Sequence, residues 1–160
     1  MRRHARRRRE FLAGLALGLV MAGCAEEPLP SPPLPPDLRV VAPPPGVPAE
    51  NARFSGRWIG KWEGQLEHVL VVELQVQNDK ATEVIAVYSW GVSGELGVGT
   101  PGWARVRGRI EGGALRLELT RVHATAVYTM QADGTLVGEY WRGDRVTSRA
   151  RLARAPREGP

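Results

Sequence analysis

Between about Arg53 and Arg154, hydrophobic and polar residues alternate in short runs separated by turn residues. In the clearest run, Val106, Gly108 and Ile110 alternate with arginines, and alternating leucines follow in 114–121. Such alternation is typical of strands with one buried face and one solvated face. The pattern predicts eight strands, near residues 54–63, 67–77, 82–90, 103–110, 114–121, 124–131, 135–142 and 145–153. It predicts no helix after residue 23.

Short turns separate several of these strands, at 78–79, 111–113, 133–134 and 143–144, where Asn, Asp and Gly gather. Such residues favour tight hairpins, so consecutive strands should pair antiparallel. Eight short antiparallel strands in about 100 residues favour closure into an up-and-down β-barrel, because closure removes unpaired strand edges. We therefore expect an all-β domain over 53–154, followed by a short tail over 155–160.

The N-terminal 23 residues differ from the rest of the chain. Six arginines lie in residues 1–10, and Phe11 to Gly23 is apolar and ends in small residues. Thirteen residues are too few for a helix across a bilayer core, which needs about 20. A cationic stretch followed by a short apolar stretch is typical of an export signal, so 1–23 is predicted to be a signal peptide.

The sequence Met21-Ala22-Gly23-Cys24 resembles the lipobox of bacterial lipoproteins. This resemblance implies that Cys24 becomes the mature N-terminus and carries acyl chains, two or three of which anchor a protein stably. Ala25 rather than Asp follows the cysteine, which in similar lipoproteins goes with the outer membrane, facing the periplasm. Residues 8–12 also resemble the twin-arginine export motif, with an ordinary Sec signal as the alternative.

Residues 24–52 form a proline-rich segment, in which ten of the 21 residues from Pro28 to Pro48 are proline. Proline removes a backbone donor and fixes φ, which favours polyproline II over helix or central strand. We expect a disordered tether that, fully extended, holds the barrel roughly 65 Å from the membrane. The alternative is a PxxP ligand for an SH3-like partner, although this spacing is hard to avoid in such a composition.

The charge of the chain is concentrated in the signal peptide. The formal net charge is +5, but from residue 24 onward the chain has 16 basic and 16 acidic residues. A mature chain without net positive charge gives no support to nucleic-acid binding. The single cysteine excludes an internal disulfide framework and a multi-cysteine metal site.

The first predicted strand carries a distinctive pattern. Aromatic residues and glycines share one face of it, with Phe54, Gly56, Trp58 and Trp62 as the structural positions. The sequence Phe-x-Gly-x-Trp resembles the start of the calycin superfamily, which includes lipocalins, fatty-acid-binding proteins and avidins. The resemblance implies an eight-stranded barrel with Trp58 closing one end beneath an arginine of the last strand, for which Arg149 or Arg151 is expected.

Aromatic residues supply the candidate binding site. Tyrosine and tryptophan combine a large apolar surface with a polar group, which suits the mouth of a ligand cavity. We expect a small, partly apolar ligand to contact Tyr88, Trp90, Trp103, Tyr128 and Tyr140. The glycine-rich stretch 91–102 is either a lid across the barrel end or a flexible loop. Alternatively, the rings fill the interior, and the barrel serves as an envelope module that binds protein or glycan.

Catalytic chemistry has little support in the sequence. His68 and His123 are the only histidines of the mature chain, and neither belongs to a motif with metal-ligand spacing. Ser89 and Ser93 lie outside any nucleophile-elbow motif. Arg105, Arg107 and Arg109 share one exposed face, which is interpreted as a solvated surface rather than an anion site. We predict no enzymatic activity, no metal and no cofactor.

Overall fold

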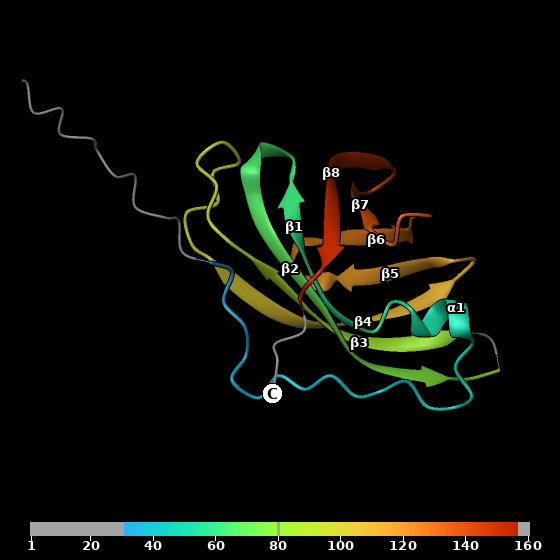
Figure 1. Ribbon diagram of the computed structural model, residues 1–160. Helices are drawn as coiled ribbons and strands as arrows, with labels where there is room; N and C mark the ends of the chain where they lie inside the picture. The colour runs from blue at the N-terminus through green and yellow to red at the C-terminus, as the bar shows by residue number, and fades with distance from the viewer. Residues whose placement is uncertain (1–30, 80, 157–160) are drawn as a thin grey trace, which may run out of the picture.

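The computed structural model describes residues 31–79 and 81–156 and shows a closed barrel of eight strands, each antiparallel to the next (Figure 1). Strand β1 also pairs with β8, from Trp58 opposite Arg154 to Trp62 opposite Ala150, which closes the barrel. The strands are β1 (Gly56–Trp62), β2 (Leu66–Gln77), β3 (Thr82–Trp90), β4 (Gly102–Glu111), β5 (Ala114–Leu119), β6 (Ala124–Met130), β7 (Leu136–Arg142) and β8 (Arg145–Arg154).

The prediction of an all-β, up-and-down, eight-stranded barrel is confirmed, and the architecture agrees with the calycin resemblance. The structure adds one helical turn, α1 (Ala49–Ala52), and two 3-10 turns, η1 (Glu63–Gln65) and η2 (Thr120–Val122). The prediction of no helix is therefore wrong for α1, which is too short to show a helical period. Within the described residues, no helix has the length and apolar character needed to cross a membrane.

Alternating side chains build the interior. On β4 and β5, Ile110, Leu115 and Leu117 are at most 1% exposed and point inward, while the neighbouring Arg109 and Arg116 are exposed. Gly108 lies inward too, opposite Leu117, where an added Cβ would come 2.5 Å from a Leu117 methyl group. The sequence alternation therefore sets both the strand register and the sidedness of the barrel wall.

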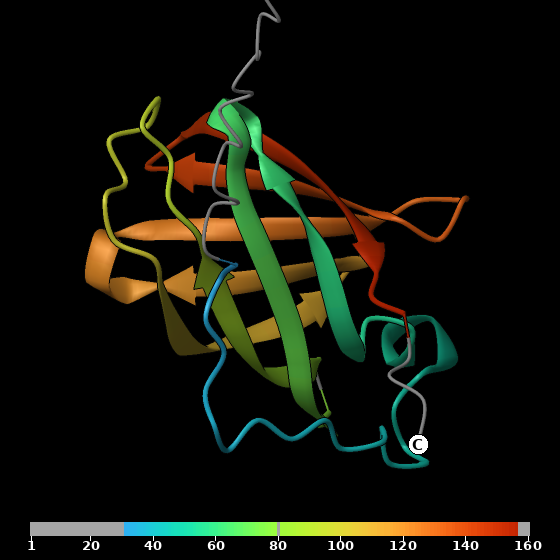
Figure 2. The same cartoon turned by 60° about the vertical axis from the view of Figure 1, so that its left-hand side comes forward.

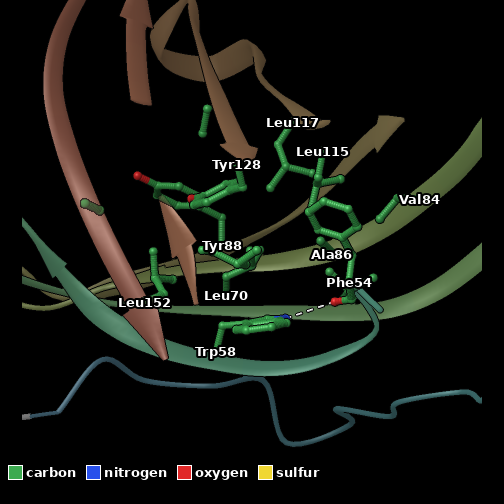
Figure 3. Close-up of a cluster of buried hydrophobic side chains, with 14 of the residues drawn as sticks. Phe54, Trp58, Leu70, Val84, Ala86, Tyr88, Leu115, Leu117, Tyr128 and Leu152 are labelled. Atoms are coloured by element: carbon green, nitrogen blue, oxygen red, sulfur yellow. Dashed lines mark hydrogen bonds between the residues drawn. The ribbon is translucent and has the colours of Figure 1, made fainter. Parts of the chain in front are cut away.

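One end of the barrel is closed by aromatic rings. Phe54 and Trp58 are at most 2% exposed, and the Trp58 indole N–H donates to the Phe54 carbonyl oxygen at 2.9 Å (Figure 3). Gly56 between them has φ +106°, a conformation that favours glycine. We call this end, which α1 also flanks, the closed end.

The arginine over Trp58 is Arg154, so the expectation of Arg149 or Arg151 is wrong. The guanidinium carbon of Arg154 lies 4.2 Å from the Trp58 ring centroid. Two of its nitrogens donate to the carbonyl oxygens of Ser55 at 2.8 Å and Arg53 at 2.6 Å. The expected and the observed arginine differ because of the strand register, which pairs Trp58 of β1 with Arg154 of β8.

The proline-rich segment differs from the expected detached tether. Residues 31–48, which we call the strap, run along the outside of β2, β3 and β4 and lead into α1 (Figures 1 and 2). Leu34 and Leu38 pack against an outer apolar cluster of Val69, Val71 and Val87. An extended proline-rich chain loses little entropy on docking, and this apolar patch gives it a surface to bury.

Polar contacts hold the strap beside these apolar ones. The Arg105 guanidinium lies 3.1 Å from an Asp37 carboxylate oxygen and 2.7 Å from one of Glu73. The backbone N–H groups of Arg39 and Val41 donate to the Glu73 carboxylate and carbonyl oxygens. The hydrogen bond from Arg105 lowers the pKa of Asp37, so the pair is ionised at neutral pH. Arg105 therefore belongs to a strap contact rather than to a solvated arginine row.

Candidate ligand-binding cavity

The barrel contains a cavity of about 810 Å³ at the end opposite α1, where the β3–β4 loop lies. We call this end the mouth. The Trp62 ring lines the cavity together with the aromatic rings of Tyr88, Trp90 and Tyr140 and the aliphatic side chains of Leu66 and Val106. A cavity of this size with a mainly apolar and aromatic lining is typical of small-molecule sites.

Small inward residues leave this space empty. Gly102 and Ala104 are the first inward positions of β4, opposite Trp90 and Tyr88 of β3. Ser148 occupies an inward position of β8, opposite Tyr140. An added Cβ at Gly102 would come 2.6 Å from the Trp90 ring, so glycine here lets that ring lie flat on the wall.

Three of the five predicted binding residues line the cavity. Tyr88, Trp90 and Tyr140 come from β3 and β7, and their rings form a chain of contacts with Trp62. The Trp62 and Tyr140 ring centroids are 5.9 Å apart with the rings edge to face. The Trp90 indole N–H donates to the Thr100 carbonyl oxygen at 3.1 Å, which fixes this ring against the β3–β4 loop.

The other two predicted residues lie elsewhere. Trp103 points outward, is 39% exposed and pairs with Ser89 on the outer face of the wall. Tyr128 points inward but is fully buried beside Trp62 and is absent from the cavity lining. Conversely, Trp62, which was expected to be purely structural, lines the cavity. Its place on the inward face at the mouth end of β1 was the available signal.

A buried polar network lies next to the cavity. His68 is fully buried, with Nδ1 2.7 Å from the Ser89 carbonyl oxygen and Nε2 2.8 Å from the Tyr128 hydroxyl. A carbonyl oxygen only accepts, so Nδ1 carries the proton and Nε2 accepts from Tyr128. Burial lowers the pKa of His68 to about 4 and raises the pKa of Tyr128 above its usual range. All these groups are neutral at physiological pH.

His68 contacts the backbone carbonyl oxygen of Ser89 and not its hydroxyl group, so the two side chains do not form a catalytic dyad. The Ser89 hydroxyl lies on the outer face, where it donates to the Pro33 carbonyl oxygen at 2.5 Å. His123 is exposed in the turn before β6. Within residues 31–79 and 81–156, no three His, Asp or Glu side chains gather as a metal site would require.

The β3–β4 loop forms one edge of the mouth. Ser93 and Val98 exchange backbone hydrogen bonds of 2.9 and 2.8 Å, and the Ser93 hydroxyl donates to the Gly64 carbonyl oxygen at 2.6 Å. Leu96 at the tip packs over Gly64, where an added Cβ would lie 2.7 Å from the leucine side chain. The loop is therefore a hydrogen-bonded turn at the cavity edge, intermediate between the expected lid and a flexible loop.

No known family model and no characterised protein matches this sequence.

Proposed function

We propose that the barrel binds a small, partly apolar ligand in the mouth cavity. The observation that carries this proposal is the cavity of about 810 Å³ with its four aromatic rings. Ligand pockets typically have volumes of roughly 300 to 1,000 Å³. The indole and phenol groups of the lining offer a few polar contacts on an otherwise apolar wall, which suits a ligand with an apolar body and at least one polar group.

We further propose that Cys24 anchors the protein to a membrane of the cell envelope, in the outer membrane facing the periplasm. This part rests on the lipobox-like sequence alone, because the signal peptide, the twin-arginine-like motif and Cys24 lie outside the residues that the structure describes. The interaction-module alternative requires a filled interior, so the cavity favours ligand binding over it.

The proposal is tested by filling the cavity without disturbing its outer wall. Ala104 lines the mouth and lies on β4, where Ala104→Trp places a large ring in the empty space. Arg107 is exposed on the outer face of the same strand, so Arg107→Ala is the matched control. Each protein is purified without denaturation and examined by native mass spectrometry and by titration with 1-anilinonaphthalene-8-sulfonate.

We expect a copurified adduct or saturable dye binding in the unmodified protein and in Arg107→Ala, and the loss of both in Ala104→Trp. A bare mass together with no saturable dye binding in the unmodified protein would contradict the proposal. Equal binding by Ala104→Trp would show that the ligand or dye lies outside the cavity.

A further inference from the structure

The strap begins at the mouth end of the barrel. An added Cβ at Gly91, the residue after β3, would lie 3.7 Å from Pro32 of the strap. The next residue, Pro33, accepts the hydrogen bond from Ser89 at the same end of β3. From there the strap runs away from the mouth and reaches α1 at the closed end. The chain therefore joins the barrel at its mouth.

This attachment shortens the path between anchor and barrel. Seven residues lie between Cys24 and Pro32, which makes eight steps from one Cα atom to the next. At about 3.6 Å per residue, even a fully extended chain between them spans at most about 29 Å. A free proline-rich segment up to the first strand would allow more than twice that distance and would attach at the closed end. Docking of the strap thus moves the point of attachment to the mouth.

The residues around the mouth suit a membrane surface. Leu96 of the β3–β4 loop and Val122 of η2 line the cavity edge and are 47% and 48% exposed. Arg121 and Arg142 line the same edge, and neither forms an ion pair with any residue that the structure describes. We call these four residues the rim. Apolar side chains beside arginines favour the interface of a bilayer with anionic lipids.

The loops at the mouth also carry carboxylates, at Glu63, Glu95 and Asp144, but the charged residues that line the cavity itself are all arginines. Three charged residues line the cavity, namely Arg105, Arg121 and Arg142, and no described carboxylate does. Arg105 is engaged by the strap contact with Asp37 and Glu73, which leaves the two rim arginines available.

We infer that the rim docks on the anionic bilayer surface that holds the lipid anchor, so that the cavity opens toward the membrane. This inference rests on the proposed acylation of Cys24. The short link raises the local concentration of the rim at the membrane, so weak contacts by four side chains are sufficient for docking. A ligand that partitions into the bilayer then has a direct path into the cavity.

The orientation is tested on the mature, acylated protein in vesicles of phosphatidylethanolamine and phosphatidylglycerol. Cys24 is the only cysteine and is blocked by the acyl chain, so Thr120→Cys, an exposed position beside the rim, accepts a fluorophore selectively. Ala132→Cys, exposed in the β6–β7 turn at the closed end, is the matched control. Lipids with a nitroxide on the headgroup quench a fluorophore that lies near the membrane surface.

We expect strong quenching at position 120 and little at position 132. Asp37→Arg together with Leu38→Asp should release the strap and reduce this difference. Arg121→Glu together with Arg142→Glu should weaken docking roughly tenfold or more. Equal quenching at the two positions in the proteins that carry only the labelling cysteine, or stronger quenching at 132, would overturn the inference.

Two readouts separate this inference from the proposed function. The mass of the purified protein shows whether Cys24 carries acyl chains, and a protein without them would overturn the anchor and the orientation together. Saturable dye binding reports the cavity and does not depend on orientation. An acylated protein that binds dye but shows equal quenching at positions 120 and 132 would refute the orientation alone.

Discussion

The buried imidazole of His68 makes the stability of the barrel depend on pH. In the fold its pKa is about 4, against 6.5 for an unperturbed histidine, because burial disfavours the charged form. The groups in contact with it are the Tyr128 hydroxyl, the Tyr88 ring and the Trp62 ring, none of which is charged near neutral pH. The unfolded chain therefore binds a proton near pH 6.5 that the folded protein does not accept until about pH 4.

The sign and size of the effect follow from these two values. When the unfolded state binds more protons, the free energy of unfolding falls as the pH falls. The stabilisation is fully present above about pH 6.5 and is lost progressively toward pH 4. With the two pKa values above, the free energy of unfolding decreases by about 2 kcal/mol between pH 7 and pH 5. The decrease approaches about 3 kcal/mol near pH 4.

The assay is urea unfolding, followed by tryptophan fluorescence, at pH 7, 6 and 5. Carboxyl groups of the unfolded chain titrate near pH 4, so this range isolates the histidine. His68→Gln retains a donor for the Ser89 carbonyl oxygen and removes the titrating group, so we expect a nearly flat pH dependence. His123→Gln changes an exposed histidine and should keep the slope of the unmodified protein. If His68→Gln keeps the full slope, or the unmodified protein is equally stable at pH 7 and 5, the reasoning is wrong.

Three further substitutions test the contacts that hold the closed end, the network and the strap. Arg154→Ala should lower the free energy of unfolding by about 1 to 3 kcal/mol, because it removes the cation over Trp58 and two charge-assisted hydrogen bonds; Arg151→Ala, at an exposed ion pair, should change it by less than about 1 kcal/mol in the same denaturation assay. Tyr128→Phe leaves a buried imidazole nitrogen without its donor and should cost about 1 to 3 kcal/mol, and an unchanged midpoint would contradict the hydrogen bond. Leu38→Asp should expose the strap to proteolysis while the barrel stays folded, so uncut strap in limited digestion would count against the apolar docking.

The alternation of residue types was sufficient to predict the barrel wall. Leu115 and Leu117 lie inward and Arg116 lies outward, because a strand has a period of two and only one face is buried. The same period of two along β4 places Trp103 on the outer face, away from the cavity. Trp103 lies an even number of residues from the outward arginines of β4, whereas Ala104 lies an even number of residues from the inward Gly108 and Ile110.

The alternation did not predict how deep an inward side chain lies in the barrel, nor that the strap docks on the outer wall. The alternation along β6 places Tyr128 on the inward face, but its distance from the mouth depends on the register of all the strands around it. The strap is a tertiary contact between an extended segment and the outer wall. Its signal in the sequence was the run of apolar residues 69–72 in β2, where neighbouring side chains are buried on both faces of the wall. A strand that is buried on both faces needs a cover, and only the strap supplies one within the described residues.

The contrast between the two ends of the barrel supports a role for the cavity. At the closed end, Phe54, Trp58 and the inward leucines fill the interior, whereas at the mouth the first two inward positions of β4 are only Gly102 and Ala104. Larger apolar residues at these positions would bury more surface, at roughly 25 cal/mol for each Å² removed from water. Stability alone therefore does not favour an empty mouth. If Ala104→Trp binds no dye yet unfolds at a higher urea concentration than the unmodified protein, the empty space reduces stability and is retained for binding. If the variant is instead less stable, the small residues serve the packing of Trp90 and Tyr88, and the cavity is a consequence of that packing rather than a ligand site.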